Sequence, residues 1–311
     1  MNKTLSILFS ILVLLAVIVS GCTGQGEEGK RSIVVGSKID TEGSLLSQII
    51  ILALRDNGLD VVDKSQFGPT SVVRKALESD ELDIYPEYTG NGAFFFDEAE
   101  SDVWNDAKKG YERVKELDKA TYNIVWLQSA PANNTWAIAI PNKLSDDEGI
   151  RTLDDLAAYV NSGGYVKLIG SEEFVTSPVA LPKFQEIYGF TLKQEQLLTV
   201  SSGDTAQTEK AASEGTDGVN AAMAYGTDGS LSALGLVVLA DPRGAQPVYE
   251  PAPRVRGEII DKYPEIADIL NPIFESLDLV TLQTLNAKIA VEGQNATDVA
   301  KEYLISKGFL K

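Results

Sequence analysis

Residues 83–92 read DIYPEYTGNG, and they complete the pattern that decides the fold of the N-terminal half. A β-rich run ends there at two tyrosines and passes directly into a turn that contains Pro and Gly. Strand-like and helical runs alternate before it. They are RSIVVGSK (31–38), the helical 41–58, DVVDKS (60–65), the helical 70–81 and LDIYPEY (82–88). This order predicts strands joined by crossover helices, and therefore a mostly parallel sheet covered by helices on both faces.

The same alternation returns further along the chain. We expect strands at 134–141, 165–170, 218–226 and 234–241, with helices at 152–160 and 181–189 between them. From about residue 254 the chain is predicted to be helical, with amphipathic segments at 265–277, 281–293 and 296–308. In the first helix, Thr41 or Ser44 is the candidate cap and Gly58 the terminator. The sequence therefore predicts two α/β units.

Composition narrows the function. The chain has 311 residues, of which 44% are apolar, so two domains with substantial cores are expected. With 27 basic and 45 acidic residues the formal charge is −18, which disfavours nucleic acid as a partner. The chain has no histidine, which excludes His-based catalytic triads and His metal ligands. No metal, cofactor or ATP-binding glycine loop is indicated.

The N-terminus has the features of an export signal. Residues 1–21 carry one early lysine, an apolar run and small residues, and Cys22 follows in the sequence VSGC. This resembles the lipobox of bacterial and archaeal lipoproteins, which predicts a lipid anchor on Cys22 and a tether over residues 22–30. The alternative is an ordinary signal, or an anchor helix with an incidental cysteine. As Cys22 is the sole cysteine, no internal disulfide can form.

Two exported α/β units suggest a solute-binding protein whose ligand lies in a cleft between lobes. Five ordered blocks support this. They are VGSKIDTEG (35–43), LDIYPEYTGNGAFFF (82–96), PANNTWAIAI (131–140), GVNAAMAYGTDG (218–229) and GAQPVYEPAPRV (244–255). From Ser32 to Phe309 the chain resembles the substrate-binding subunits of glycine betaine, choline and proline betaine ABC importers, most closely the OsmF/YehZ branch.

The resemblance implies the type II periplasmic-binding fold, an α/β architecture of two lobes with a ligand cleft between them. One lobe would comprise residues 31–134 plus 239–311, and the other residues 135–238. The implied ligand is a quaternary-ammonium osmoprotectant. Such a head has no N–H to donate, so aromatic faces must hold it, each contributing ~0.5 to 2 kcal/mol in a desolvated site. The implied cage residues are Tyr88, Trp136, Tyr225 and Tyr249.

Polar ligand contacts are implied at Lys38, Asn91 and Asn134. Ser177 is a departure, because the family usually has an arginine there that forks onto the betaine carboxylate. We therefore expect weaker selection for a carboxylate, and choline is a candidate ligand.

Each site residue also has a structural alternative. A tyrosine at a strand end can simply complete a core, and Lys38 can be a solvated loop residue. Tyr85 and the phenylalanines at 94–96 are predicted to pack in the core.

The implied mechanism is capture by lobe closure and delivery to an ABC permease, with import driven by its ATPase subunit. The mature protein would be a monomer on the extracytoplasmic side of a membrane. Two alternatives remain open. The first is a binding protein for another small solute, such as an amino acid. The second is an enzyme on the same fold using Lys38, Glu42 or Glu87, although no recognised motif arranges these residues for catalysis.

Overall fold

The computed structural model describes residues 32–99, 101–201 and 205–310. The predicted signal peptide (1–21), the tether (22–30) and the anchor residue Cys22 lie outside the described residues. The chain divides into two units, Met1–Ser32 and Ile33–Lys311, and the following concerns the second unit. Within it, the described strands form two five-stranded sheets.

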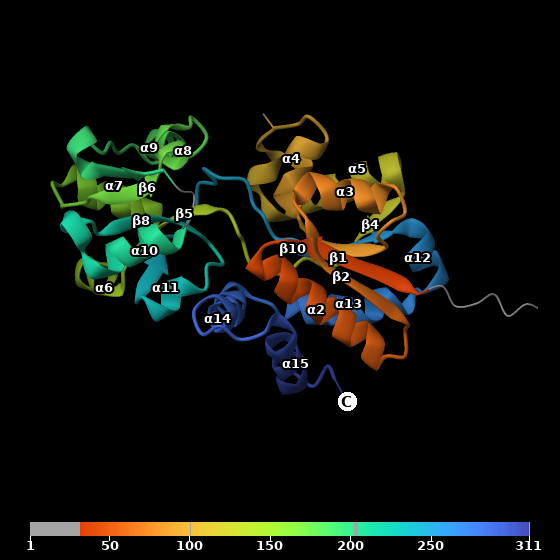
Figure 1. The fold of residues 1–311 in the computed structure, drawn as a ribbon. Helices are drawn as coiled ribbons and strands as arrows, with labels where there is room; N and C mark the ends of the chain where they lie inside the picture. The colour runs from red at the N-terminus through yellow and green to blue at the C-terminus, as the bar shows by residue number, and fades with distance from the viewer. Residues whose placement is uncertain (1–31, 100, 202–204, 311) are drawn as a thin grey trace, which may run out of the picture. The chain divides into compact units, whose positions relative to one another are not determined.

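The first sheet has the strand order β2-β1-β3-β10-β4 (Figure 1). Its strands are β1 (Ile33–Lys38), β2 (Val61–Gly68), β3 (Ile84–Tyr88), β4 (Ile124–Trp126) and β10 (Pro251–Arg256). Strand β1 pairs in parallel with β2 and β3, whereas β10 is antiparallel to both β3 and β4. The sheet is therefore mixed, and its one reversed strand comes from the C-terminal part of the chain.

Helices cover both faces of this sheet. They are α2 (Thr41–Asp56), α3 (Thr70–Glu78), α4 (Gly92–Phe95), α5 (Ala107–Tyr122), α12 (Gly257–Lys262), α13 (Glu265–Glu275), α14 (Leu279–Ala290) and α15 (Ala296–Ser306). Alternation along the strands assigns the faces. Ile33 and Val35 belong to the core with α2, α13, α14 and α15, whereas Val34 packs with α3 on the opposite face.

The second sheet has the order β7-β6-β8-β5-β9. Its strands are β5 (Trp136–Pro141), β6 (Leu168–Ser171), β7 (Leu197–Val200), β8 (Ala221–Tyr225) and β9 (Leu236–Val238). Its helices are α6 (Asn142–Glu148), α7 (Leu153–Asn161), α8 (Glu172–Thr176), α9 (Leu181–Tyr188), α10 (Thr205–Glu214) and α11 (Ser230–Ala233). Ile138 and Met223 join the core with α7, α8 and α9, whereas Ala139 and Ala222 join the core with α10 and α11.

The expected pair of α/β lobes is present, with lobe 1 built on the first sheet and lobe 2 on the second. The strands of lobe 2 all fall within residues 136–238, and those of lobe 1 within 33–126 and 251–256. The proposed lobe boundaries at 134/135 and 238/239 remain predictions.

Strand β10 was not predicted, and its residues 254–256 lie in the stretch that was wrongly expected to be helical from about residue 254. Pro251 and Pro253 cannot donate backbone hydrogen bonds, and this is typical of an edge strand rather than an interior one. The interior position is possible because their carbonyls face the segment after β4. There the Ala130 N–H donates to Pro251 O at 2.8 Å and the Leu127 N–H donates to Pro253 O at 3.0 Å.

The predicted cap of α2 was also wrong. Asp40, rather than Thr41 or Ser44, is the N-cap residue, and its carboxylate accepts a hydrogen bond from the Gly43 N–H at 2.6 Å. A carboxylate at this position also interacts favourably with the helix dipole. The predicted termination is confirmed, because Asn57 closes the helix and Gly58 follows with φ of 81°.

Candidate functional site

A cleft of about 810 Å³ is lined by residues of both lobes, and we call it the inter-lobe cleft. It lies at the end of β3 in lobe 1 and at the end of β8 in lobe 2, which occupy equivalent places in their sheets. In each sheet the third strand in order, β3 or β8, ends at a tyrosine and pairs with the antiparallel strand. Of the predicted site residues, seven line this cleft: Lys38, Tyr88, Asn91, Asn134, Trp136, Tyr225 and Tyr249.

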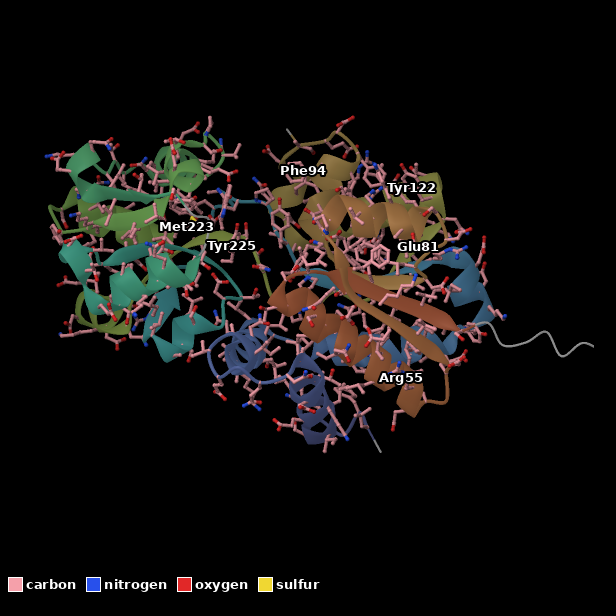
Figure 2. All side chains as sticks on the ribbon, in the orientation of Figure 1. Arg55, Glu81, Phe94, Tyr122, Met223 and Tyr225 are labelled. Atoms are coloured by element: carbon pink, nitrogen blue, oxygen red, sulfur yellow. The ribbon has the colours of Figure 1, made fainter. Side chains whose placement is uncertain are left out.

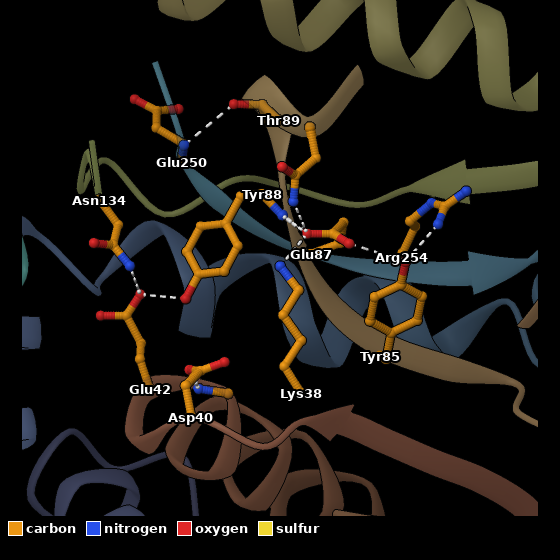
Figure 3. A network of polar contacts seen from close by, with 12 residues as sticks. Lys38, Asp40, Glu42, Tyr85, Glu87, Tyr88, Thr89, Asn134, Glu250 and Arg254 are labelled. Carbon is orange, nitrogen blue, oxygen red and sulfur yellow. Dashed lines mark hydrogen bonds and ion pairs between the residues drawn. The ribbon is translucent and has the colours of Figure 1, made fainter. Parts of the chain in front are cut away.

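Tyr88 is the last residue of β3 and is 7% exposed. Its hydroxyl donates to Glu42 Oε1 at 2.7 Å, and Lys38 Nζ lies 4.3 Å from the centre of its ring (Figure 3). Burial raises the pKa of the Tyr88 hydroxyl well above its usual value, and the neighbouring Glu42 carboxylate adds to the effect. The phenol is therefore a neutral hydrogen-bond donor with a fixed orientation.

Lys38 ends β1 beside this ring and is not the solvated loop residue that the alternative would require. Its ammonium forms a 2.5 Å ion pair with the fully buried Glu87. Glu87 Oε1 also accepts hydrogen bonds from the Tyr88 N–H and from Asn91 Nδ2, each at 2.7 Å. Burial alone would raise the pKa of Glu87, but the Lys38 charge and these donors outweigh it, and the pKa is lowered. The pair therefore fixes a lysine at the wall of the cleft.

Tyr85, predicted to be a core residue, is fully buried. Its hydroxyl donates to Glu87 Oε2 at 3.1 Å and accepts a hydrogen bond from Arg254 at 2.6 Å. Arg254 in turn forms a two-pronged ion pair with Asp118, at 2.8 and 2.7 Å. A buried polar chain thus runs from the interior of lobe 1 to Lys38 in the cleft.

Lobe 2 contributes Trp136 and Tyr225. Trp136 begins β5, Tyr225 ends β8, and the two residues lie directly opposite each other in the antiparallel pair. Trp136 Nε1 donates to the Tyr225 hydroxyl at 3.0 Å, and the Trp136 ring packs against Phe174 with centres 6.0 Å apart. Burial raises the pKa of Tyr225. The two side chains are therefore held as one aromatic wall.

Tyr249 lies just before β10, in the segment that returns the chain to lobe 1. Its backbone N–H donates to Asn133 Oδ1 at 2.8 Å, and its carbonyl accepts from the Asn134 N–H at 3.0 Å. Its ring lies over Gly90, where an added Cβ would be 2.9 Å from two ring carbons. Burial raises the pKa of Tyr249 to about 12. The position of Tyr249 thus depends on both segments that connect the lobes, the one between β4 and β5 and the one between β9 and β10.

Asn134 lines the cleft and directs its amide toward Glu42 Oε1 at 3.4 Å. Ser177 is placed differently. It is half-buried and follows α8 as its C-cap residue, and it does not line the cleft, whereas Pro178 and Val179 do. Ser177 is therefore beside the cleft rather than in its wall.

The prediction that the phenylalanines at 94–96 all pack in the core was wrong for Phe94. This side chain is 66% exposed and lines the cleft, and Figure 2 shows it on the side of lobe 1 that faces Tyr225. Its neighbours Phe95 and Phe96 are partly buried and lie over Arg74, with ring centres 3.8 and 5.4 Å from the guanidinium carbon. Phe94 and Phe95 are consecutive residues of α4 and cannot share one helix face, which is the signal that could have identified Phe94.

The comparisons with known proteins agree with this architecture. Residues 31–306 match the family model OpuAC, described as the substrate binding domain of the ABC-type glycine betaine transport system. The chain belongs to this family. It is 53% identical over 279 residues to the glycine betaine-binding protein YehZ of Escherichia coli (strain K12), covering 90% of this chain and 92% of that protein. It is 32% identical to a glycine-betaine-binding protein of Pseudomonas aeruginosa, covering 92% and 91% of the two chains.

Among solved structures, apo YehZ from Escherichia coli superposes with a TM-score of 0.87 at 53% identity, covering 90% of this chain and 99% of that one. The predicted fold class and family are thus confirmed. The family consists of binding proteins of ABC transport systems, which are not enzymes. In the described parts of the chain, every helix is too short or too polar to span a bilayer.

Proposed function

We propose that this protein captures a quaternary-ammonium solute, either glycine betaine, choline or a close analogue, in the inter-lobe cleft for delivery to an ABC permease. The relatives named above are glycine betaine-binding proteins, which supports the ligand class. The observation that carries the proposal is the meeting of four aromatic side chains from both lobes at one cleft. They are Tyr88, Trp136, Tyr225 and Tyr249.

The chemistry of the cleft suits such a ligand. A trimethylammonium group spreads its charge over methyl groups and cannot donate N–H hydrogen bonds, so ring faces are its natural partners. The hydroxyl of Tyr88 is engaged with Glu42, and Tyr225 accepts the Trp136 N–H. The rings are therefore oriented before a ligand arrives, which lowers the entropy lost on binding.

The carboxylate end of a betaine has fewer partners. Lys38 is a candidate, but its charge is already matched by Glu87 at 2.5 Å. Asn91 and Asn134 can donate amide hydrogen bonds at the same wall. The family resemblance implies an arginine at the position of Ser177, and without it the zwitterion gains no two-pronged ion pair, so affinity for betaine should be modest.

A ligand that contacts Tyr88 in lobe 1 and Tyr225 in lobe 2 stabilises whichever lobe arrangement lets it touch both. The closed protein would then present one continuous surface to the permease, whose ATPase subunit supplies the energy. The extracytoplasmic location, the lipid anchor on Cys22 and the monomeric state belong to the same proposal. Cys22→Ser should abolish incorporation of labelled fatty acid, and retention of the label would refute the anchor.

The experiment is a calorimetric and tryptophan-fluorescence titration of the purified chain with glycine betaine, choline and proline. Trp136→Ala should weaken binding of the quaternary amines by about 2- to 30-fold, which corresponds to the cation-π energy of one ring. Tyr165→Ala is the matched control, because Tyr165 is an exposed lobe 2 aromatic outside the cleft. Binding of proline alone, or equal effects of both substitutions, would contradict the proposal.

A further inference from the structure

Glu42 is a buried carboxylate that neither the family match nor the sequence motifs assign to the ligand site. It lies in the first turn of α2 and is 5% exposed. Other buried carboxylates of lobe 1 face a cation, as Glu87 faces Lys38 at 2.5 Å and Asp118 faces Arg254 at 2.7 Å. Among the described residues, no lysine or arginine forms an ion pair with Glu42.

Neutral donors hold this carboxylate instead. Oε1 accepts from the Tyr88 hydroxyl at 2.7 Å and faces the amide of Asn134 at 3.4 Å. Oε2 accepts from Asn286 Nδ2 at 2.7 Å. Three donors converge on two oxygens, and their hydrogen bonds favour the ionised form. Burial outweighs them and raises the pKa of Glu42, so the ionised form needs a higher pH than usual, and no cation neutralises its charge.

This charge lies directly behind a ring of the cleft, since Tyr88 lines the cleft with its ring and contacts Glu42 with its hydroxyl (Figure 3). A phenol that donates to a carboxylate gains electron density in its ring, so the face that a cation approaches becomes more negative. The carboxylate also attracts the cation directly through a medium from which water is largely excluded. Both effects act on charge and leave a neutral molecule of the same shape almost unaffected.

The other charged groups at the cleft do not cancel this effect. The charge of Lys38 is neutralised by its ion pair with Glu87. At the lobe 2 rim, Lys183 lies 3.3 Å from Glu186, which neutralises its charge. Asp102 at the lobe 1 rim is exposed, and solvent screens its charge.

We infer that Glu42 sets the charge preference of the cleft, favouring ligands with a net positive charge over zwitterions and over neutral isosteres. The inference rests on the proposed function, because it assumes that the ligand's head lies against Tyr88. Glu42 acts here as a positioning and charge-supplying residue that does not touch the ligand. Glycine betaine should benefit less than choline, because its own carboxylate offsets part of the attraction.

The test compares choline, glycine betaine and the neutral carbon isostere 3,3-dimethylbutan-1-ol by calorimetry on the full chain. Glu42→Gln should weaken choline binding about tenfold, glycine betaine binding less, and binding of the isostere by under about twofold. A tenfold change corresponds to about 1.4 kcal/mol.

Two variants serve as controls. Asp40→Asn removes a nearby exposed charge while keeping an effective helix cap, and it should change choline binding by less than about twofold. Glu42→Asp keeps the charge, so it should retain the preference for choline over the isostere even if all affinities fall.

A pH profile gives an independent readout that does not depend on the glutamine variant folding. Burial raises the pKa of Glu42, so the wild-type preference for choline should decline as the pH is lowered from 8 toward 4.5, its ordinary value. The titratable groups facing it are Asp40 at the helix start, Tyr88 on β3 and the Lys38 and Glu87 pair. Of these, Glu87 has a lowered pKa and Tyr88 a raised one, so both titrate outside that range.

Equal weakening of all three ligands by Glu42→Gln, or no weakening, would overturn the inference while leaving the proposed function intact. A choline preference that stays flat between pH 8 and 4.5 would overturn it as well. If the wild-type protein binds no quaternary ammonium compound, the proposed function fails and the inference fails with it.

Discussion

Gly90 offers a way to displace one ring of the cleft without altering any aromatic residue. It follows Tyr88 by two positions and lies under Tyr249. An added Cβ would be 2.9 Å from Cδ1 and Cε1 of that ring and 2.9 Å from the Val248 carbonyl oxygen. Ordinary contacts of a Cβ begin at 3.4 Å, so Gly90→Ala forces a shift of roughly half an ångström in a tightly packed region.

The ring is the group that can move. The carbonyl belongs to backbone that is fixed by the bond from the Val248 N–H to the Trp104 carbonyl at 2.8 Å, whereas Tyr249 is only half-buried. Overpacking of this kind typically costs about 1 to 3 kcal/mol of stability. If Tyr249 is one of the rings that hold the ligand, displacing it should remove a large part of ~0.5 to 2 kcal/mol of cation-π energy. Affinity for choline should therefore fall by about 2- to 30-fold.

Two measurements separate these effects. Urea unfolding gives the loss of stability, and calorimetry well below the unfolding midpoint gives the dissociation constant of the folded protein. The matched control is Gly149→Ala in lobe 2, where φ is 70° and no atom lies within 4 Å of the added Cβ. Left-handed backbone costs a non-glycine residue about 1 to 2 kcal/mol, so this variant should be destabilised to a similar degree yet bind normally.

Wild-type affinity in a destabilised Gly90→Ala protein would refute the reasoning, because it would show that the position of Tyr249 does not matter to the ligand. Equal loss of affinity in both glycine variants would refute it differently. In that case, general loosening of the protein, rather than displacement of a ring, would be responsible.

Three further predictions follow from the site and its supporting contacts. The lowered pKa of Glu87 means that its ion pair with Lys38 stabilises the fold fully above about pH 4.5 and loses this effect as the pH falls below that value. Lys38→Met should therefore flatten the acid limb of a urea-denaturation profile between pH 6 and 3, and an unchanged limb would count against the assignment. Arg254→Met leaves the buried Asp118 without its main partner and should cost about 3 to 5 kcal/mol in denaturant unfolding, partly restored by adding Asp118→Leu. Ser177→Arg should tighten glycine betaine more than choline in calorimetry, and equal gains for both would disprove the role given to that position.

Most of the fold could be predicted because its signals are local. The alternation of β-rich and helical runs places strands β1, β3, β5 and β8 within a few residues of their observed bounds. Strand β10 could not be found this way, since its two prolines are unfavourable in a strand unless the neighbouring strand has already ended. Only the tertiary arrangement shows that β4 ends before these prolines, and that Leu127 and Ala130, which follow β4, donate to the proline carbonyls. The long-range pairing of β10 with β3 overrides the local preference.

The site residues likewise divide into those that the sequence could predict and those that only the folded chain reveals. Tyr88 and Tyr225 could be proposed because strand ends and family motifs mark them, and they do line one cleft. Glu42 lies within one of the family blocks, VGSKIDTEG, but nothing in the sequence places it beside the ligand site. In sequence it is one acidic residue in the first turn of a helix, where a glutamate is common for reasons of helix polarity. Its burial against Asn286, 244 residues away, is a property of the folded chain alone.

The contacts of α14 suggest how occupancy of the cleft could be linked to lobe movement. This lobe 1 helix reaches the loop that follows Tyr225 in lobe 2, because Gln283 donates to the Gly226 carbonyl at 2.8 Å and Asn286 donates to the Thr227 carbonyl at 3.0 Å. Asn286 also binds Glu42, which holds Tyr88, so a single amide connects both lobes to a ring of the cleft. A motion that separates Tyr225 from Tyr88 would have to break these bonds or turn about them. Because turning preserves the bonds, the proposed opening and closing of the lobes would use α14 as its pivot.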